Sequence, residues 1–390
     1  MRAPSSGRAS PLPYPWRGIL IDEARHFFGK KAVMRIIDRM AELRFNVLHW
    51  HLVDDQGWRL EIKRYPNLTK IGSVRTVKCK SSPDWAIKDA DDHGTYGPFF
   101  YTQDEIRSVV AHALARGVEI VPEIEMPGHS LASLASYPEH FCFPEMVRGH
   151  ETLIPPKYGA EPKTIRTCCI GNDETVRFLE GVLDEVCDLF PGKVVHIGGD
   201  EAPTSSWEQC PKCRARMAAE NLETPRELQG WLMNHFIGYL SAKGKTAMGW
   251  EEIVGGLPNP ADVIVQCWHG PDQTLEALKK GYRVVLSPPD YLYFDYSQEL
   301  PDDPYDYNGS GVTLEKVRSF NPVAGIPKSF QGQVLGAECC VWSERIFTPA
   351  ELDWKLWPRA KALAAILNGL CEKVIFFALF GHWRTICDLQ

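Results

Sequence analysis

The chain has 390 residues, of which 44% are hydrophobic and 24% charged, and its formal net charge is −7. This composition is typical of a soluble globular protein and allows one large domain or two smaller ones. No long run of one charge sign occurs, so the sequence argues against partners such as nucleic acid or an anionic membrane. The longest late apolar run, residues 374–380, is too short to cross a bilayer.

Twelve cysteines are present, and two of them, Cys210 and Cys213, have the spacing of a zinc knuckle. No second Cys-x-x-Cys and no His pair completes four ligands, so we expect a structural or incidental pair, with no metal and no cofactor. Adjacent pairs such as Cys168-Cys169 favour a reducing compartment over a disulfide framework. The first residues contain no apolar segment of a secretory signal, which favours a cytoplasmic chain but leaves the compartment open.

Strand and helix patterns alternate along one predicted domain, residues 16–370, between a poorly ordered lead-in at 1–15 and a divergent tail at 371–390. The predicted strands are 18–22, 46–53, 118–124, 194–198, 246–250, 261–268, 282–287 and 334–342. The predicted helices are 30–44, 104–116, 173–189, 225–243, 274–280 and 350–367. Eight such units predict a parallel (β/α)8 TIM barrel, an α/β fold, with long loops after its strands.

Polar or aromatic side chains stand where nearly every predicted strand ends. They are Asp54, His129, Asp200, Glu201, Trp250, Trp268, Tyr293, Asp295, Trp342 and Glu344, and Arg17 stands just before the first strand. The carboxyl ends of barrel strands meet on one face, so these residues are expected to line one pocket. A pocket lined by tryptophans and acidic residues suits an uncharged, polyhydroxylated ligand, because carboxylates and arginine bind hydroxyls through charge-assisted hydrogen bonds.

The stretch 194–201 carries the strongest chemical signal, a buried strand that runs through Gly198 and Gly199 into Asp200 and Glu201. Cleavage of a glycosidic bond needs a proton donor, and Glu201 is the candidate if it is partly buried. Adjacent strand residues project to opposite sides, so Asp200 is a poor nucleophile for the bond that Glu201 protonates. We expect Asp200 to hold a neighbouring group of the substrate instead.

Taken together, the motifs resemble glycoside hydrolase family 20, the β-N-acetylhexosaminidases, from about residue 14 to about residue 364. The segments that carry the resemblance are Arg17-Gly18 with Asp22 and Arg25-His26, then 49–58 (HWHLVDDQGW), 122–129 (PEIEMPGH), 196–201 (HIGGDE), 249–252 (GWEE) and 342–344 (WSE).

The resemblance implies substrate-assisted catalysis, in which the 2-acetamido oxygen of the sugar attacks the anomeric carbon and forms an oxazolinium, with net retention. It implies these roles: Glu201 as general acid and base, Asp200 and Tyr293 on the acetamido group, His129 and Asp54 as a relay, Trp250, Trp268 and Trp342 as a box, and Arg17, Asp295 and Glu344 on the outer hydroxyls. Members of the family often have Asp where this chain has Glu125.

The expected substrates are therefore terminal β-linked GlcNAc or GalNAc of glycans or of chitin oligosaccharides, removed by an exo-acting enzyme. Release of a disaccharide, as by a lacto-N-biosidase, and a catalytically weak sugar-binding homologue are the alternatives. A metal-dependent barrel hydrolase has less support, since His49 and His51 have no third ligand at matching spacing. The sequence allows a homodimer and leaves the GlcNAc or GalNAc preference open.

Overall fold

The computed structural model describes residues 13–76, 95–147, 167–256, 263–299, 303–304 and 311–370. Residues 1–12 of the expected lead-in and the whole expected tail at 371–390 lie outside the described residues.

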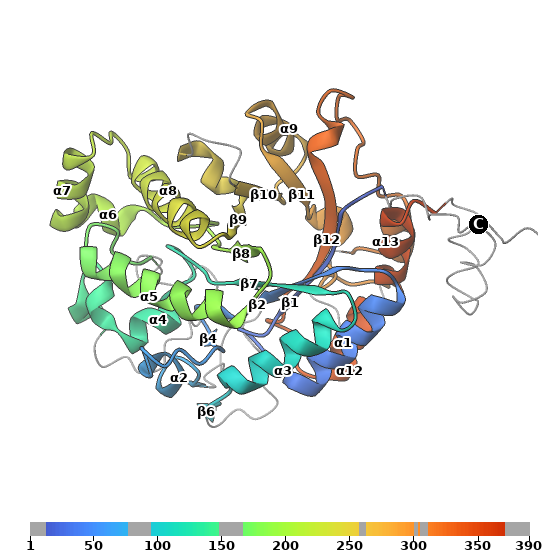
Figure 1. Cartoon of the computed structure of the whole chain (residues 1–390), viewed down its shortest axis with the longest axis horizontal. Helices are drawn as coiled ribbons and strands as arrows, with labels where there is room; N and C mark the ends of the chain where they lie inside the picture. The colour runs from blue at the N-terminus through green and yellow to red at the C-terminus, as the bar shows by residue number, and fades with distance from the viewer. Residues whose placement is uncertain are drawn as a thin grey trace, which may run out of the picture.

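Eight parallel strands close into a barrel in which each strand pairs with the next along the chain and the last pairs with the first. They are β1 (Trp16–Asp22), β2 (Val47–His51), β7 (Glu119–Glu123), β8 (Val194–His196), β9 (Thr246–Trp250), β10 (Val263–Cys267), β11 (Arg283–Leu286) and β12 (Val334–Val341). The prediction of a (β/α)8 barrel is confirmed, because the strands lie in the middle of the molecule with helices around them (Figure 1).

The barrel interior is filled in layers by side chains that alternate along the strands. The apolar layer at the amino ends consists of Trp16, Val47, Val121, Met248, Ile264 and Val285. Two residues further along three of these strands come His49, Glu123 and Gln266, all fully buried. A polar layer therefore separates the apolar base of the barrel from its carboxyl end.

The outer helices pack apolar faces against the strands. They are α1 (Lys30–Glu42), α3 (Gln103–Leu114), α5 (Asp173–Leu189), α8 (Pro225–Ala242), α9 (Pro271–Lys279), α12 (Pro349–Leu356) and α13 (Arg359–Leu367). The buried residues of α1 include Val33, Ile36 and Met40, which share one helical face. Thr102 begins α3 with a capping box to Glu105, which satisfies amide groups that the first turn leaves free.

The last predicted helix, 350–367, is wrong as a single element. Two helices, α12 and α13, occupy this range and are separated at Trp357-Pro358. Proline has no amide hydrogen to donate and disfavours helical backbone in the residue before it, so the first helix ends there.

Further short elements lie mainly in the connections that follow the strands. They are β3 (Val53–Asp54), β4 (Gly57–Trp58), α2 (Asn67–Lys70), β5 (Arg75–Thr76), β6 (Thr95–Tyr96), α4 (Leu131–Ser136), η1 (Pro138–His140), η2 (Pro144–Met146), α6 (Ser205–Gln209), α7 (Pro211–Ala219), η3 (Glu251–Gly256), α10 (Pro289–Leu292), α11 (Leu314–Arg318) and η5 (Gln331–Gln333). None of the helices within the described ranges is long and apolar enough to cross a membrane.

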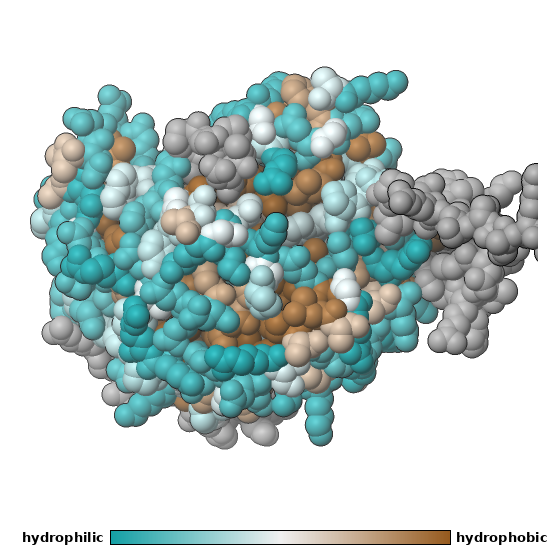
Figure 2. Space-filling view, viewed as in Figure 1, coloured by the Kyte–Doolittle hydropathy of each residue, from teal (hydrophilic) through white to brown (hydrophobic). Residues whose placement is uncertain are grey.

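Hydrophilic residues dominate the periphery of the face in Figure 2, and hydrophobic residues show mainly toward its middle. Among the described residues, the exposed large hydrophobic side chains are Phe99, Leu114 and Met146. The apolar surface of the helices is thus directed mostly at the barrel.

Candidate active site

The chain turns sharply after β8 and presents Asp200 and Glu201 at the carboxyl end of the barrel. Gly198 and Gly199 have φ of 65° and 105°, and Glu201 itself has φ of 43°. Residues other than glycine rarely adopt a positive φ. A Cβ on Gly198 would lie 1.8 Å from an oxygen of Glu125. The turn therefore requires a glycine, and Glu201 is held in a backbone conformation of the kind found at functional sites.

His129 connects this pair to Asp54. Its Nε2 lies 3.3 Å from Oδ2 of Asp200 and 3.7 Å from Oε2 of Glu201, and its Nδ1 lies 3.3 Å from Oδ1 of Asp54. Burial alone would lower the pKa of His129, but the carboxylates of Asp54 and Asp200 outweigh it and hold that pKa well above its usual range. His129 is therefore a cation at neutral pH, clamped between carboxylates.

The other oxygen of Asp54 accepts from a second cation, Arg25, whose Nη2 lies 2.8 Å from it. Burial would raise the pKa of Asp54, but Arg25 and His129 prevail and hold it well below its usual range. Asp54 thus remains a carboxylate and holds His129 in place by an ion pair.

Arg25 is a site residue that the sequence analysis did not assign. Asp22, the last residue of β1, accepts from the backbone N–H of Arg25 and from its guanidinium, both at 3.1 Å. The guanidinium also lies 3.7 Å from Glu344 and over the ring of Trp342. One feature of the sequence could have indicated that Arg25 belongs to the site: it lies three residues beyond the carboxyl end of a strand.

The expectation that Arg17 lines the pocket is wrong. Arg17 belongs to the amino end of β1, and its guanidinium donates to the backbone carbonyls of Arg44 at 2.7 Å and of Tyr14 at 2.6 Å. Parallel strands place their amino ends at the opposite face of a barrel from their carboxyl ends, so Arg17 cannot reach a ligand beside Glu201.

Four aromatic side chains from different strand ends come together above the barrel. The rings of Trp250 and Trp342 are 6.0 Å apart, Trp342 and Tyr293 are 6.1 Å apart, and Tyr293 stacks on Trp268 at 6.4 Å. Trp250 is buried, and its Nε1 donates to Glu123 at 2.8 Å. The hydrogen bond to Glu123 thus fixes the position of Trp250, one wall of the box.

Three carboxylates around this box have an oxygen that is buried and accepts no hydrogen bond: Oδ1 of Asp200, Oδ1 of Asp295 and Oε2 of Glu344. Burial, together with the charge of Glu344, raises the pKa of Asp295 to about 8. Buried acceptors without donors are costly, so a site of this kind fits a ligand that supplies hydroxyl or amide hydrogens.

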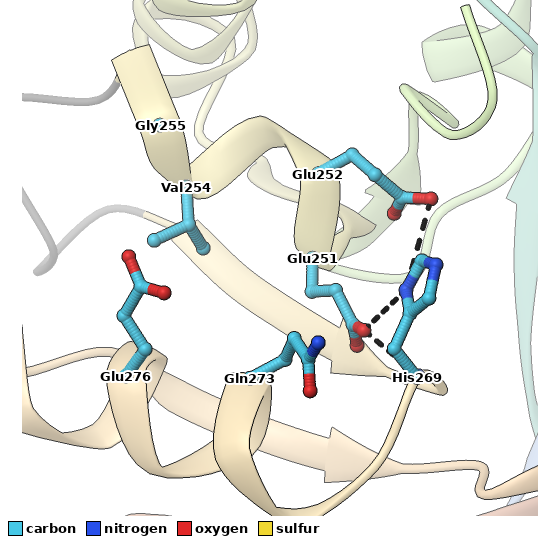
Figure 3. Close-up of a pocket in the computed structure, with 7 residues that line it drawn as sticks. All are labelled: Glu251, Glu252, Val254, Gly255, His269, Gln273 and Glu276. Carbon is cyan, nitrogen blue, oxygen red and sulfur yellow. Dashed lines mark hydrogen bonds and ion pairs between the residues drawn. The ribbon is translucent and has the colours of Figure 1, made fainter.

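A hollow of about 240 Å³ lies beside the box between η3 and α9. Figure 3 shows Glu251 and Glu252 reaching His269 on one side, with Gln273 and Glu276 of α9 on the other. Nε1 of Trp268 donates to Glu252 at 3.3 Å, so Glu252 supports a wall of the box. Burial and the charge of Asp200 raise the pKa of Glu252 to about 8.

Three sets of His and acidic residues in the described part of the chain are close enough to hold a cation: His49, Glu123 and His196; His51, Glu123 and Glu125; and Asp54, Asp55 and His129. Burial would lower the pKa of His49, but the carboxylates of Glu338 and Glu123 outweigh it and raise this pKa to about 9. The imidazolium of His49 therefore already supplies positive charge to this interior. A fourth set, of cysteines, lies elsewhere.

The chain resembles known proteins over nearly its whole length. It is 36% identical to a β-hexosaminidase of Vibrio furnissii (93% of this chain, 57% of the relative) and 36% identical to one of Porphyromonas gingivalis (90% and 43%). The solved GH20 exo-β-N-acetylglucosaminidase of Vibrio harveyi, in complex with N-acetylglucosamine, superposes with a TM-score of 0.81 at 32% identity (97% of this chain, 58% of that one).

The chain spans about half the length of these curated relatives. Residues 14–367 match the family described as glycosyl hydrolase family 20, catalytic domain. With the closed barrel and this sequence similarity, the chain belongs to glycosyl hydrolase family 20.

Proposed function

We propose that this protein is a retaining exo-β-N-acetylhexosaminidase that removes terminal β-linked GlcNAc or GalNAc by substrate-assisted catalysis. The observation that carries the proposal is the placement of Asp200 and Glu201 around one cationic imidazole, His129, at the mouth of the aromatic box. The names of the β-hexosaminidase relatives support the same reaction class.

Glu201 is the proton donor to the glycosidic oxygen. Its side chain is 38% exposed, the most open of the pair, so a leaving group can approach it. A sugar in the box would cover this side chain and exclude bulk water from it. After the leaving group departs, the same carboxylate takes a proton from water.

Asp200 is the partner of the acetamido group rather than the nucleophile. Its side chain is 15% exposed and has one oxygen without a donor, which suits an amide N–H. As the acetamido oxygen attacks the anomeric carbon, the C–O bond to the leaving group breaks and positive charge spreads over the N–C–O group. The Asp200 carboxylate stabilises this charge, and the Tyr293 hydroxyl donates to the acetamido oxygen.

Water then attacks the anomeric carbon of the oxazolinium and reopens the ring, so two inversions give net retention. His129, held by Asp54, keeps Asp200 and Glu201 oriented throughout this sequence. Arg25 and Asp295 are buried, and Glu344 lies 3.7 Å from Arg25. These three side chains would bind the outer hydroxyls of a terminal sugar, which would favour exo cleavage.

The direct test replaces Glu201 with Gln and compares two substrates. Turnover of a chitin disaccharide should fall by about 10²–10⁴-fold, because its leaving alkoxide needs a proton. The loss should be smaller for the 4-nitrophenyl β-GlcNAc glycoside, whose leaving group departs as a stable anion. Glu208→Gln, an exposed change on the neighbouring α6, is the matched control.

Near-normal disaccharide turnover by Glu201→Gln would overturn the assignment of the acid. A β-glucoside, which has no N-acyl group, should be cleaved far more slowly than the β-GlcNAc glycoside, and a thiazoline mimic of the oxazolinium should inhibit strongly. Equal rates for the two glycosides would exclude participation by the substrate. Release of intact disaccharide from longer glycans would favour the lacto-N-biosidase alternative over exo cleavage.

A further inference from the structure

Four cysteines from three separate segments of the chain meet beside helices α6 and α7. Cys142 lies between η1 and η2, Cys169 lies before α5, and Cys210 and Cys213 flank the start of α7. All four sulfurs lie within 4.8 Å of one another. In the sequence, only Cys210 and Cys213 have the spacing of metal ligands, and nothing in the spacing of Cys142 and Cys169 indicates that they join this pair.

The distances between the sulfurs match one particular arrangement. The Sγ of Cys142 is 3.7 Å from that of Cys213, and the Sγ of Cys169 is 3.8 Å from those of Cys210 and Cys213. A disulfide needs about 2.05 Å, and none joins these residues. Four thiolates at about 2.3 Å around a tetrahedral ion would lie about 3.8 Å apart along each edge.

The backbone around the cluster has the features of a metal knuckle. The N–H of Gly171 donates to the Sγ of Cys213 at 3.3 Å, which would stabilise a thiolate. A Cβ on Gly171 would lie 2.2 Å from the backbone of Lys212 and of Cys213, so only glycine allows the two segments to lie this close. Cys169, Cys210 and Cys213 are buried, and Cys142 is half-buried.

We propose that Cys142, Cys169, Cys210 and Cys213 form a structural Zn²⁺ site. The ligand set is closed, with four sulfurs and no position left for water or substrate, which is typical of structural rather than catalytic zinc. Binding of the ion releases the thiol protons and leaves four thiolates. The proposal differs from the expectation of a structural or incidental pair without metal, because two further cysteines join Cys210 and Cys213.

The site ties together two connections on the active-site side of the barrel. One connection runs from β7 to β8 and contains Cys142 and Cys169, and the other follows Glu201 and contains Cys210 and Cys213. Nε1 of the buried Trp207 donates to the carbonyl of Cys168 at 2.9 Å across the same contact. The ion would therefore fix the segment that follows the catalytic pair without contacting the sugar.

The first test measures metal in the purified protein by inductively coupled plasma mass spectrometry, before and after reconstitution of the reduced protein with ZnCl₂ and removal of free ion. We expect about one zinc ion per chain. Cobalt in place of zinc should give intense thiolate-to-cobalt absorption and the visible bands of a tetrahedral ion. Iron as the bound metal, or no zinc retained after reconstitution, would overturn the proposal.

The second test uses matched serine variants. Cys213→Ser and Cys142→Ser should lose most of the zinc and should lower Tm, whereas Cys187→Ser, which alters a half-buried cysteine outside the cluster, should retain both. If Cys213→Ser does not fold, release of zinc from the unmodified protein by a mercurial reagent gives the same information. Alkylation that finds the four cysteines in disulfides in the reconstituted protein would contradict the site.

Discussion

At the scale of single residues, Arg17 and Arg25 differ in which face of the barrel they reach. Arg17 lies within β1, and Arg25 lies three residues beyond its carboxyl end. Arg25 lies at the carboxyl end of β1 among Asp22, Asp54 and Glu344, and it reaches these carboxylates as a planar fork. Lysine keeps the charge but cannot make the forked contacts. We expect Arg25→Lys to lower kcat/KM by about 10–100-fold, measured with 4-nitrophenyl β-GlcNAc.

Arg17→Lys is the matched control, because its guanidinium bonds only to backbone carbonyls at the other end of the strand in the contacts described. It should leave kcat/KM unchanged and cost about 1–2 kcal/mol of stability through lost hydrogen bonds. A large loss of kcat/KM in Arg17→Lys with intact folding would restore the original assignment.

The raised pKa of Asp295 leads us to expect that the stability of the folded protein depends on pH. Its folded pKa of about 8 is raised by burial and by Glu344, whereas an unfolded aspartate has a pKa of about 3.9. The stabilisation from the bound proton is therefore complete below about pH 4 and is lost as pH rises toward 8. Asp295→Asn cannot ionise, so its Tm should rise relative to the parent between pH 5 and pH 8.5.

Differential scanning fluorimetry of both proteins across this range measures the effect. A difference in Tm that stays constant from pH 5 to pH 8.5 would show that the Asp295 carboxyl does not titrate there. Activity is a separate readout in this experiment, since Asp295 is proposed to bind substrate.

At the scale of elements, α13 is fastened to the loop that carries Tyr293 and Asp295. The buried guanidinium of Arg359 donates to the carbonyls of Phe294, Tyr296, Val312 and Lys355, at 2.5 to 3.0 Å. Lysine could satisfy fewer of these carbonyls, so Arg359→Lys should lower the free energy of unfolding by about 3 kcal/mol. Urea unfolding followed by tryptophan fluorescence measures this loss.

Lys361→Arg, the reverse exchange at a half-buried position of α13, is the control and should change stability by less than about 0.5 kcal/mol. Equal stability of Arg359→Lys and the parent would show that the loop does not depend on this guanidinium.

At the scale of the whole molecule, Glu338 joins four strands across the barrel interior. Its carboxylate accepts from Trp16 at 2.8 Å and from Gln266 at 2.7 Å, and it pairs with His49 at 2.7 Å. Removal of one partner of a buried ion pair leaves the other uncompensated, so Glu338→Gln should cost about 3 kcal/mol at pH 7. The exposed Glu315→Gln is the control.

The pH dependence of this variant checks the charge of His49. Although burial opposes it, Glu338 and Glu123 raise the folded pKa of His49 to about 9. The stabilisation of the folded state by protonated His49 is then complete below about pH 6.5 and is lost as pH rises through 9. The Tm of the parent should fall over this range, and the Tm difference from Glu338→Gln should shrink; a constant difference would contradict a charged His49.

Local patterns in the sequence were enough to predict the barrel and most residues of the proposed active site. The alternation of strand and helix patterns gave the order of the eight strands, because parallel neighbours joined by crossover segments follow the chain. The position of Asp200, Glu201 and His129 just after strands was enough to predict that they meet, since the carboxyl ends of barrel strands share one face.

Features that depend on contacts between distant segments became visible only in the folded chain. The fold places Arg25 at the site and Arg17 away from it, because the two ends of one strand lie on opposite faces of the barrel. It also joined Cys142 and Cys169 to the pair at 210 and 213, across loops whose paths no local pattern specifies. Periodicity reports the direction of a side chain relative to its own element, whereas a binding site depends on which elements the closed barrel makes neighbours.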